Sequence, residues 1–352
     1  LRILNVLFIL VFLSDIAHAE DVLEKAMMNP NPDRKSGKVI ARLENDNVKI
    51  SFVKSKNKGK KSVSPVYEIM TASGWYEVPL NASAESYRIL MADTSLEMGL
   101  HQWVHPKWKE AASVKEKSKN GLTKVVWKAG ENYDAVIKNA RQDGKNRVVL
   151  EFYPLKIGEM KAIWELHPDE NTAKVEMQFT PKQEAQYSLG YFLFNSKPIE
   201  EVDELLMPML VQRKRFPEEE FTQLQSSAPT PLSLMQTSTG GQTLSWGVSG
   251  EPTEVPFEFP IPIKSHYGLH IKNPAGEVQP SIFGPLLGTP ASRKDAGETL
   301  SFSFRLFVQN AKWYAAYRDI ADNVFGWYDY RKNGEVSMTD AVYNMIELYM
   351  DD

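Results

Sequence analysis

Residues 147–179 read RVVLEFYPLKIGEMKAIWELHPDENTAKVEMQF. Three runs in this stretch, 147–153, 160–166 and 173–179, combine apolar and β-branched residues over strand-like lengths. Pro168-Asp169-Glu170-Asn171 joins the second run to the third, and turn-forming residues between two apolar runs are typical of a hairpin. The stretch therefore predicts neighbouring antiparallel strands.

Similar patterns extend the prediction along most of the chain. Two polar or Pro-rich stretches, 217–238 and 251–262, predict long connections, because Pro cannot donate to a strand ladder. Many strands with few helical periods between them predict one large antiparallel sandwich over residues 20–308. Further strands are expected at 48–52, 123–127, 187–194, 243–248, 267–271 and 299–308.

The N-terminus has the form of a secretory signal peptide over residues 1–19. Arg2 precedes an apolar stretch, 3–13, and an Ala-His-Ala sequence ends at Ala19, as the small-x-small cleavage rule requires. The apolar stretch is too short to span a bilayer. We expect cleavage before Glu20 and export to the periplasm or the medium of a bacterium, with no membrane association afterwards.

Composition narrows the class of partner. The chain has 352 residues, of which 42% are hydrophobic and 24% charged, with a net charge of -4 and no Cys. This composition is typical of a globular protein that needs no disulfides. It gives no reason to expect nucleic acid, which usually requires a basic face. The basic run 54–61 predicts a solvated hairpin loop. We expect no cofactor, and the oligomeric state stays open.

The pattern becomes helical after Ala311. Trp313, Tyr317, Ile320 and Val324 are spaced by four and three, as is Trp327, which predicts an amphipathic helix. So broad an apolar face must be covered by other helices or by the sandwich.

A second helix is predicted after the Gly turn at 331–334. Ser337 is its expected N-cap, in a capping-box-like sequence that ends at Asp340. This helix runs into two carboxylates at 351–352, which oppose the helix dipole. We therefore expect residues 309–352 to form a helical hairpin that begins a larger helical domain continuing beyond Asp352.

Residues 296–308, AGETLSFSFRLFV, are similar to the closing strand of galactose-mutarotase-like super-sandwich domains. In many bacterial carbohydrate-active enzymes such a domain precedes an (α/α) toroid of the six-hairpin glycosidase type, and residues 313–352 resemble the first hairpin of that toroid. The resemblance implies a mainly β protein: a large antiparallel super-sandwich followed by the start of a truncated toroid.

The resemblance also implies a function. The chain would be a fragment of a secreted glycoside hydrolase acting on a poly- or oligosaccharide. Its catalytic carboxylates would lie in the toroid beyond Asp352, so no catalytic residue is assigned. A polysaccharide lyase and a non-catalytic carbohydrate-binding sandwich remain alternatives.

Trp103, His105 and Trp108 are the candidate carbohydrate contacts. Aromatic rings stack on the C–H faces of sugars and polar groups bind the hydroxyls, so this cluster suits a saccharide surface. Packing in the core with a turn at Pro106 is the alternative. Trp75 is a further candidate of the same kind.

Residues 329–340, DYRKNGEVSMTD, resemble a calcium loop and half of a dockerin, which would make the chain a docking protein. Arg331 stands where an oxygen ligand should face the ion, so a helix–turn–helix connection is favoured. His266 and His270 are expected on one face of a strand, without the partners of a zinc site. We expect no metal.

Overall fold

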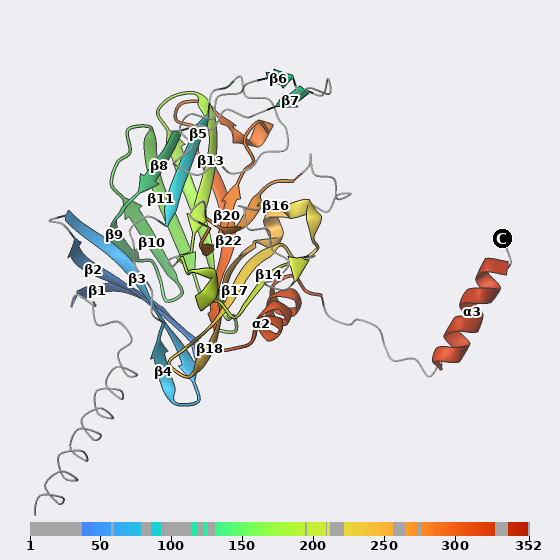
Figure 1. Cartoon of the computed structure of the whole chain (residues 1–352). Helices are drawn as coiled ribbons and strands as arrows, with labels where there is room; N and C mark the ends of the chain where they lie inside the picture. The colour runs from blue at the N-terminus through green and yellow to red at the C-terminus, as the bar shows by residue number, and fades with distance from the viewer. Residues whose placement is uncertain are drawn as a thin grey trace, which may run out of the picture.

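The computed structural model describes residues 37–57, 60–78, 86–92, 94, 115–117, 123–125, 131–193, 196–208, 210–211, 222–255, 265–273, 276–327 and 337–350. The protein is mainly β, with antiparallel sheets, as the sequence predicts. The sheets form the body in Figure 1, and the helical elements follow them in the chain.

The larger sheet has nine strands in the order β15-β14-β17-β18-β22-β12-β11-β10-β9. The last strand in sequence, β22, lies in its middle and pairs with both β12 and β18. The expected hairpin joins β11 to β12, where the N–H of Glu170 donates to the carbonyl of His167 over 3.3 Å. The strands are β9 (Ile137–Gln142), β10 (Arg147–Phe152), β11 (Gly158–Glu165), β12 (Thr172–Pro181), β14 (Glu204–Met207), β15 (Leu210–Val211), β17 (Leu232–Thr239), β18 (Gln242–Gly250) and β22 (Leu300–Gln309).

The second sheet runs in the order β16-β19-β20-β13-β5-β8, and β21 pairs with β13. Its strands are β5 (Tyr87–Ala92), β8 (Glu131–Ala135), β13 (Ala185–Phe192), β16 (Thr222–Leu224), β19 (Gly268–Lys272), β20 (Val278–Gly284) and β21 (Arg293–Lys294). Short 3-10 turns occur at Ile199–Glu201, Gln225–Ser227, Pro252–Glu254 and Pro290–Ser292.

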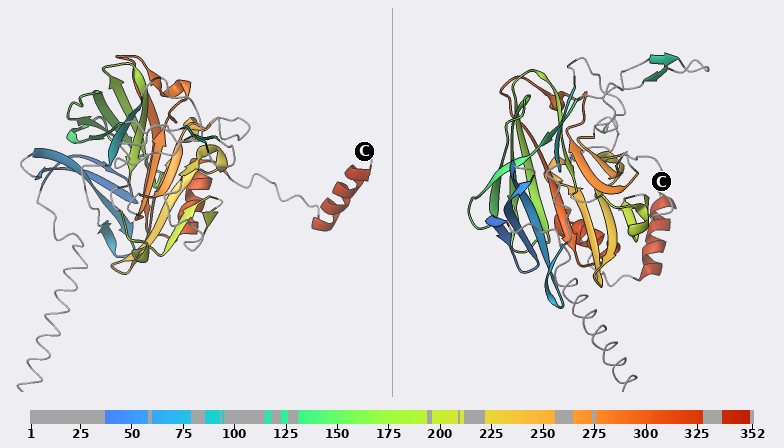
Figure 2. Two further views of the ribbon diagram at one scale, coloured as in Figure 1. Left: turned by 45° about the horizontal axis from the view of Figure 1, so that its top comes forward. Right: turned by 60° about the vertical axis from the view of Figure 1, so that its left-hand side comes forward.

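A smaller sheet at one end contains β1 (Lys38–Glu44), β2 (Val48–Asn57), β3 (Lys60–Thr71) and β4 (Gly74–Glu77) in that order (Figure 2). The basic run 54–61 was expected to be a loop, but most of it lies in β2 and β3, where Lys54 pairs with Val63. Backbone hydrogen bonds between β2 and β3 extend this hairpin into the basic run, which its charge pattern alone did not indicate. A separate pair comprises β6 (Lys115–Lys117) and β7 (Thr123–Val125).

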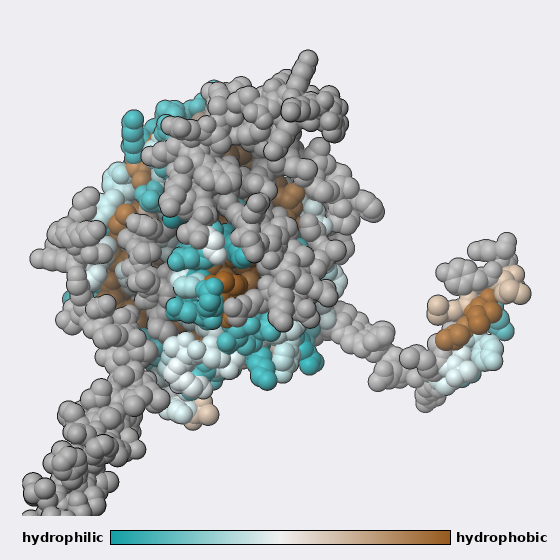
Figure 3. Space-filling view, in the orientation of Figure 1, coloured by the Kyte–Doolittle hydropathy of each residue, from teal (hydrophilic) through white to brown (hydrophobic). Residues whose placement is uncertain are grey.

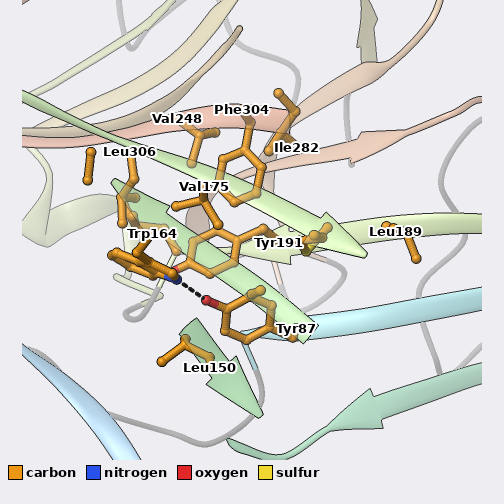
Figure 4. Close-up of a cluster of buried hydrophobic side chains, with 14 of the residues drawn as sticks. Tyr87, Leu150, Trp164, Val175, Leu189, Tyr191, Val248, Ile282, Phe304 and Leu306 are labelled. Carbon is orange, nitrogen blue, oxygen red and sulfur yellow. Dashed lines mark hydrogen bonds between the residues drawn. The ribbon is translucent and has the colours of Figure 1, made fainter. Parts of the chain in front are cut away.

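The two large sheets enclose an aromatic core (Figure 4). Trp164 of β11 donates its indole N–H to the hydroxyl of Tyr87 in β5 over 2.7 Å. The ring centroids of Tyr191 and Phe304 lie 4.9 Å apart, which joins β13 to β22. Phe52 of the small sheet packs edge-on against Trp164 at 5.5 Å. Each such buried apolar side chain contributes about 1.5–3 kcal/mol of transfer free energy.

Helix α2 (Trp313–Asp319) and the π-helical turn η8 (Ile320–Val324) cover the outer face of the nine-stranded sheet. Ala316 and Ile320 are buried there against Phe307 of β22 and Leu232 of β17. The sandwich therefore covers the apolar stripe, as the sequence predicts. Trp327 is the exception, because 52% of it is exposed.

Helix α3 (Met338–Met350) stands apart from the sandwich and from α2 (Figures 1 and 2). The predicted N-cap is confirmed, since the N–H of Asp340 donates to Ser337 Oγ over 3.1 Å. Residues 328–336 lie outside the described part, so the hairpin expected over residues 309–352 stays a prediction. In the described part of the chain, no helix is long and apolar enough to cross a membrane.

Residues 217–238 were predicted to be a connection, and this was wrong in part. They contain β16 and most of β17. The segment is polar on average, but Leu232 and Leu234 face α2 while Met235 joins the main core. Burial on both sides of the sheet stabilises a strand that its composition does not indicate.

Candidate functional site

Trp103, His105 and Trp108 lie outside the described residues, so their role stays a prediction. Trp75 lies in β4 and is half-buried. The ammonium of Lys49 is 3.9 Å from the centroid of the Trp75 ring, in cation–π geometry. One face of this predicted contact is therefore occupied by a cation.

The two histidines do not share a strand face, contrary to expectation. His266 precedes β19 and is exposed, whereas His270 lies within β19 and is buried. Within the described residues, no group of three or more His, Cys, Asp or Glu side chains could hold a metal ion. Residues 329–336 of the calcium-like sequence lie outside the described part, and Asp340 accepts a hydrogen bond from Ser337 Oγ over 2.7 Å.

The outer face of the seven-stranded sheet carries four side chains from three adjacent strands, which we call the Arg88 cluster: Arg88, Asp134, Ser188 and Phe192. Tyr87 and Ile89 point into the core, so strand alternation directs Arg88 outward. Pairing of β5 with β8 places Asp134 directly opposite Arg88. Pairing of β5 with β13 brings Ser188 and Phe192 to the same face.

The contacts within the Arg88 cluster are close. Arg88 Nε lies 3.0 Å from Asp134 Oδ1, and the guanidinium carbon lies 4.3 Å from the centroid of the Phe192 ring. The Asp134 side chain, on the edge strand β8, is 46% exposed, so water reaches the ion pair from this edge. The buried Ser188 hydroxyl has no hydrogen-bond partner among the described residues.

Phe283 of β20 and His270 of β19 lie on the same outer face, one and two strands beyond β13. Their ring centroids are 5.1 Å apart. Phe283 also lies close to the backbone of Gly268, where an added Cβ would come within 2.3 Å of the ring. Ser188, Phe192, His270 and Phe283 are buried, whereas solvent reaches the Arg88–Asp134 pair at the β8 edge, where the pair can hydrogen-bond a polar ligand.

Sequence reasoning missed this cluster because its members are far apart in the chain. Arg88 and Asp134 sit on different strands, and Ser188 lies about a hundred residues beyond Arg88. The one local signal is a charged residue, Arg88, between the apolar positions of a strand, and such a residue usually marks a solvated face.

A second charged cluster lies on the outer face of the nine-stranded sheet. Arg305 Nε is 2.7 Å from Glu251 Oε2. Arg305 Nη1 contacts Glu170 and the Thr172 hydroxyl. Burial lowers the pKa of Arg305, but hydrogen bonds and charges from Glu251 and Glu170 more than offset this and raise the pKa overall. Because Arg305 binds both carboxylates, we interpret the cluster as a structural network that connects β22 to the β11–β12 turn.

Glu254 lies beside this network. It accepts a hydrogen bond from the Ser303 N–H over 3.0 Å. Burial raises the pKa of the Glu254 carboxyl, and the charge of Glu251 adds to that effect, although the Ser303 hydrogen bond opposes it.

Comparison with known proteins gives no family assignment. No family model matches the chain, and no curated protein matches it. Similar solved structures include a protein from Synechocystis sp. PCC 6803, with 13% identity over 80% of this chain and 98% of that one, at a TM-score of 0.36. A galactose mutarotase-like protein from Lactobacillus casei ATCC 334 is 9% identical over 77% of this chain and 100% of that one, also at 0.36.

The heparan sulfate lyase HepC from Pedobacter heparinus is another similar structure. It is 10% identical over 85% of this chain but 42% of the lyase, at a TM-score of 0.25. Since all three TM-scores are below 0.5, these likenesses carry no weight in the proposal that follows.

Proposed function

We propose that this chain is the sandwich part of an exported carbohydrate-active protein, and that the Arg88 cluster contacts the saccharide. The observation that carries the proposal is the Arg88–Asp134 ion pair, which solvent reaches at the β8 edge through the 46% exposed Asp134 side chain. The whole protein is proposed to be a glycoside hydrolase.

The chemistry of the cluster supports saccharide binding. Arg88 has N–H donors besides Nε, and Asp134 has a second acceptor oxygen besides Oδ1. Neighbouring sugar hydroxyls act as both donors and acceptors, so an Arg–carboxylate pair can bind two of them at once. Phe192 is buried behind the guanidinium, and its ring helps to hold Arg88 in position.

Hydrolysis of a glycosidic bond needs two carboxyl groups facing one another across the bond. We assign these to a helical domain to which α3 belongs. The exposed apolar side of α3 supports this assignment, because Val342, Met345 and Ile346 are each at least half exposed (Figure 3). A helix with such a face is stable when another surface covers it. Export is supported by the signal-peptide pattern of residues 1–19.

Calorimetric titration of the chain from Glu20 onward with neutral and acidic oligosaccharides tests the binding role. Arg88→Met should weaken binding about tenfold or more, since it removes the donors and leaves Asp134 unpaired. Arg318→Met is the matched control, because Arg318 is exposed on α2. Equal affinity of the two variants would remove the Arg88 cluster from the proposal.

Activity of the whole protein separates the alternatives. A glycoside hydrolase releases new reducing ends without unsaturation, whereas a lyase leaves an unsaturated sugar that absorbs ultraviolet light. Saccharide binding with neither product would favour the non-catalytic binding protein. N-terminal sequencing of the exported protein should begin at Glu20.

A further inference from the structure

The outer face of the small sheet carries an aromatic surface separate from the Arg88 cluster. Met70 lies directly opposite Trp75 in the pairing of β3 with β4. Glu68 is two residues before Met70 and therefore shares its face, while Tyr67 and Ile69, on either side of Glu68, point into the core. Pairing of β2 with β3 places Lys49 opposite Glu68 on this outer face.

The Trp75 ring is held in place from one side. The Lys49 ammonium lies 3.9 Å from the ring centroid and 3.8 Å from the Glu68 carboxylate. Lys49 is largely covered and its charge is offset by Glu68. The other ring face points away from the lysine, and a ring already fixed in this way loses little conformational freedom when a ligand binds.

The surface beside the ring combines apolar and acidic groups. Met70 is 40% exposed and widens the apolar surface next to Trp75. The Glu68 carboxylate is partly exposed and lies beside the Lys49 ammonium, where it can accept hydrogen bonds. Glu77, opposite Glu68 in the adjacent strand, adds a second carboxylate on this face.

We propose that Trp75, Met70 and Glu68 form a second saccharide-binding surface, which takes a neutral pyranose. The C–H face of the sugar stacks on the side of the Trp75 ring opposite Lys49, and Glu68 accepts hydrogen bonds from its hydroxyls. Because Glu68 already offsets the charge of Lys49, this ion pair does not attract uronic acids or sulfated sugars, which favours a neutral sugar. The inference rests on the proposed carbohydrate function but uses a different sheet from the Arg88 cluster.

Trp75→Ala should weaken binding of neutral oligosaccharides about tenfold in calorimetry, and Trp75→Phe should retain part of the affinity, since a smaller ring still stacks. The probes are gluco-, xylo- and manno-oligosaccharides of six units. Trp327→Ala is the matched control, because Trp327 is an exposed tryptophan far along the chain in the segment after η8. Thermal unfolding of each variant checks that it is folded.

An NMR titration gives a direct readout that does not depend on the stability of the Ala variant. The indole N–H resonance of Trp75 is assigned by its loss in Trp75→Phe. This resonance should shift when a neutral oligosaccharide is added and should not shift when an acidic oligosaccharide is added. An unmoved resonance at saturating ligand, or a shift with acidic sugars alone, would overturn the inference. If Arg88→Met abolishes binding while Trp75→Ala does not weaken it, the inference fails and the proposed function stands. If no saccharide binds at all, both fail.

Discussion

Arg305→Met should destabilise the sandwich strongly. Arg305 sits in the central strand β22, where its side chain is 10% exposed and lies 2.7 Å from a Glu251 carboxylate that is 6% exposed. Removing the guanidinium leaves Glu251 buried without its counter-charge, which typically costs about 3–5 kcal/mol. Glu170 is 26% exposed and can turn toward water, so its contribution is small. We expect a loss of about 3–4 kcal/mol.

Urea unfolding followed by tryptophan fluorescence measures this loss. At an m-value of about 3 kcal/mol/M, the unfolding midpoint should fall by about 1 M. The double variant Arg305→Met with Glu251→Met should recover most of the stability, because it replaces the whole ion pair by apolar groups. Arg318→Met, at an exposed arginine, should change the stability by less than about 0.5 kcal/mol. A shift for Arg305→Met no larger than that of this control would refute the reasoning, as would a double variant less stable than the single one.

Three other changes have defined outcomes. Because burial raises the pKa of Glu254, the folded protein keeps this proton to higher pH than the unfolded chain, and stability should fall as pH rises from the ordinary carboxyl pKa of 4.5 through the raised pKa. Glu254→Gln removes this fall, so its stability advantage over the wild type in urea unfolding should grow between about pH 4 and about pH 7; a constant difference would contradict the pKa shift. Gly250→Ala would place a Cβ 1.6 Å from the Tyr267 hydroxyl oxygen. We expect the free energy of unfolding to fall by about 1–3 kcal/mol or more. An unchanged unfolding midpoint would show that the core rearranges around the added methyl group without a loss of stability. Ser337→Ala removes the N-cap of α3 and should cost the helix about 1 kcal/mol, seen as lower helical circular dichroism, while Ser337→Asp should keep the signal.

Local patterns predicted the elements whose stability is local. The hairpin of β11 and β12 depends on turn-forming residues at 168–171, and the start of α3 depends on Ser337 capping the first turn. Both features are readable within a few residues. The sandwich class follows from the number of strand-like segments, and the structure confirms it.

The candidate site could not be read in the same way. Trp75 was picked out as a single aromatic residue, but its support by Lys49 and Glu68 depends on the pairing of three strands. The strand role of residues 232–239 likewise depends on α2, which follows about eighty positions later and covers Leu232.

The sequence by itself determined that this protein is an antiparallel β sandwich followed by helices, since strand and helix periods are set by neighbouring residues. Only the tertiary structure decided that β22 pairs with β12 and β18 and that Asp134 lies opposite Arg88. Strand order depends on which distant segments bury the most apolar surface together while satisfying their backbone hydrogen bonds. That choice is made by the whole core at once, and the functional faces follow from it.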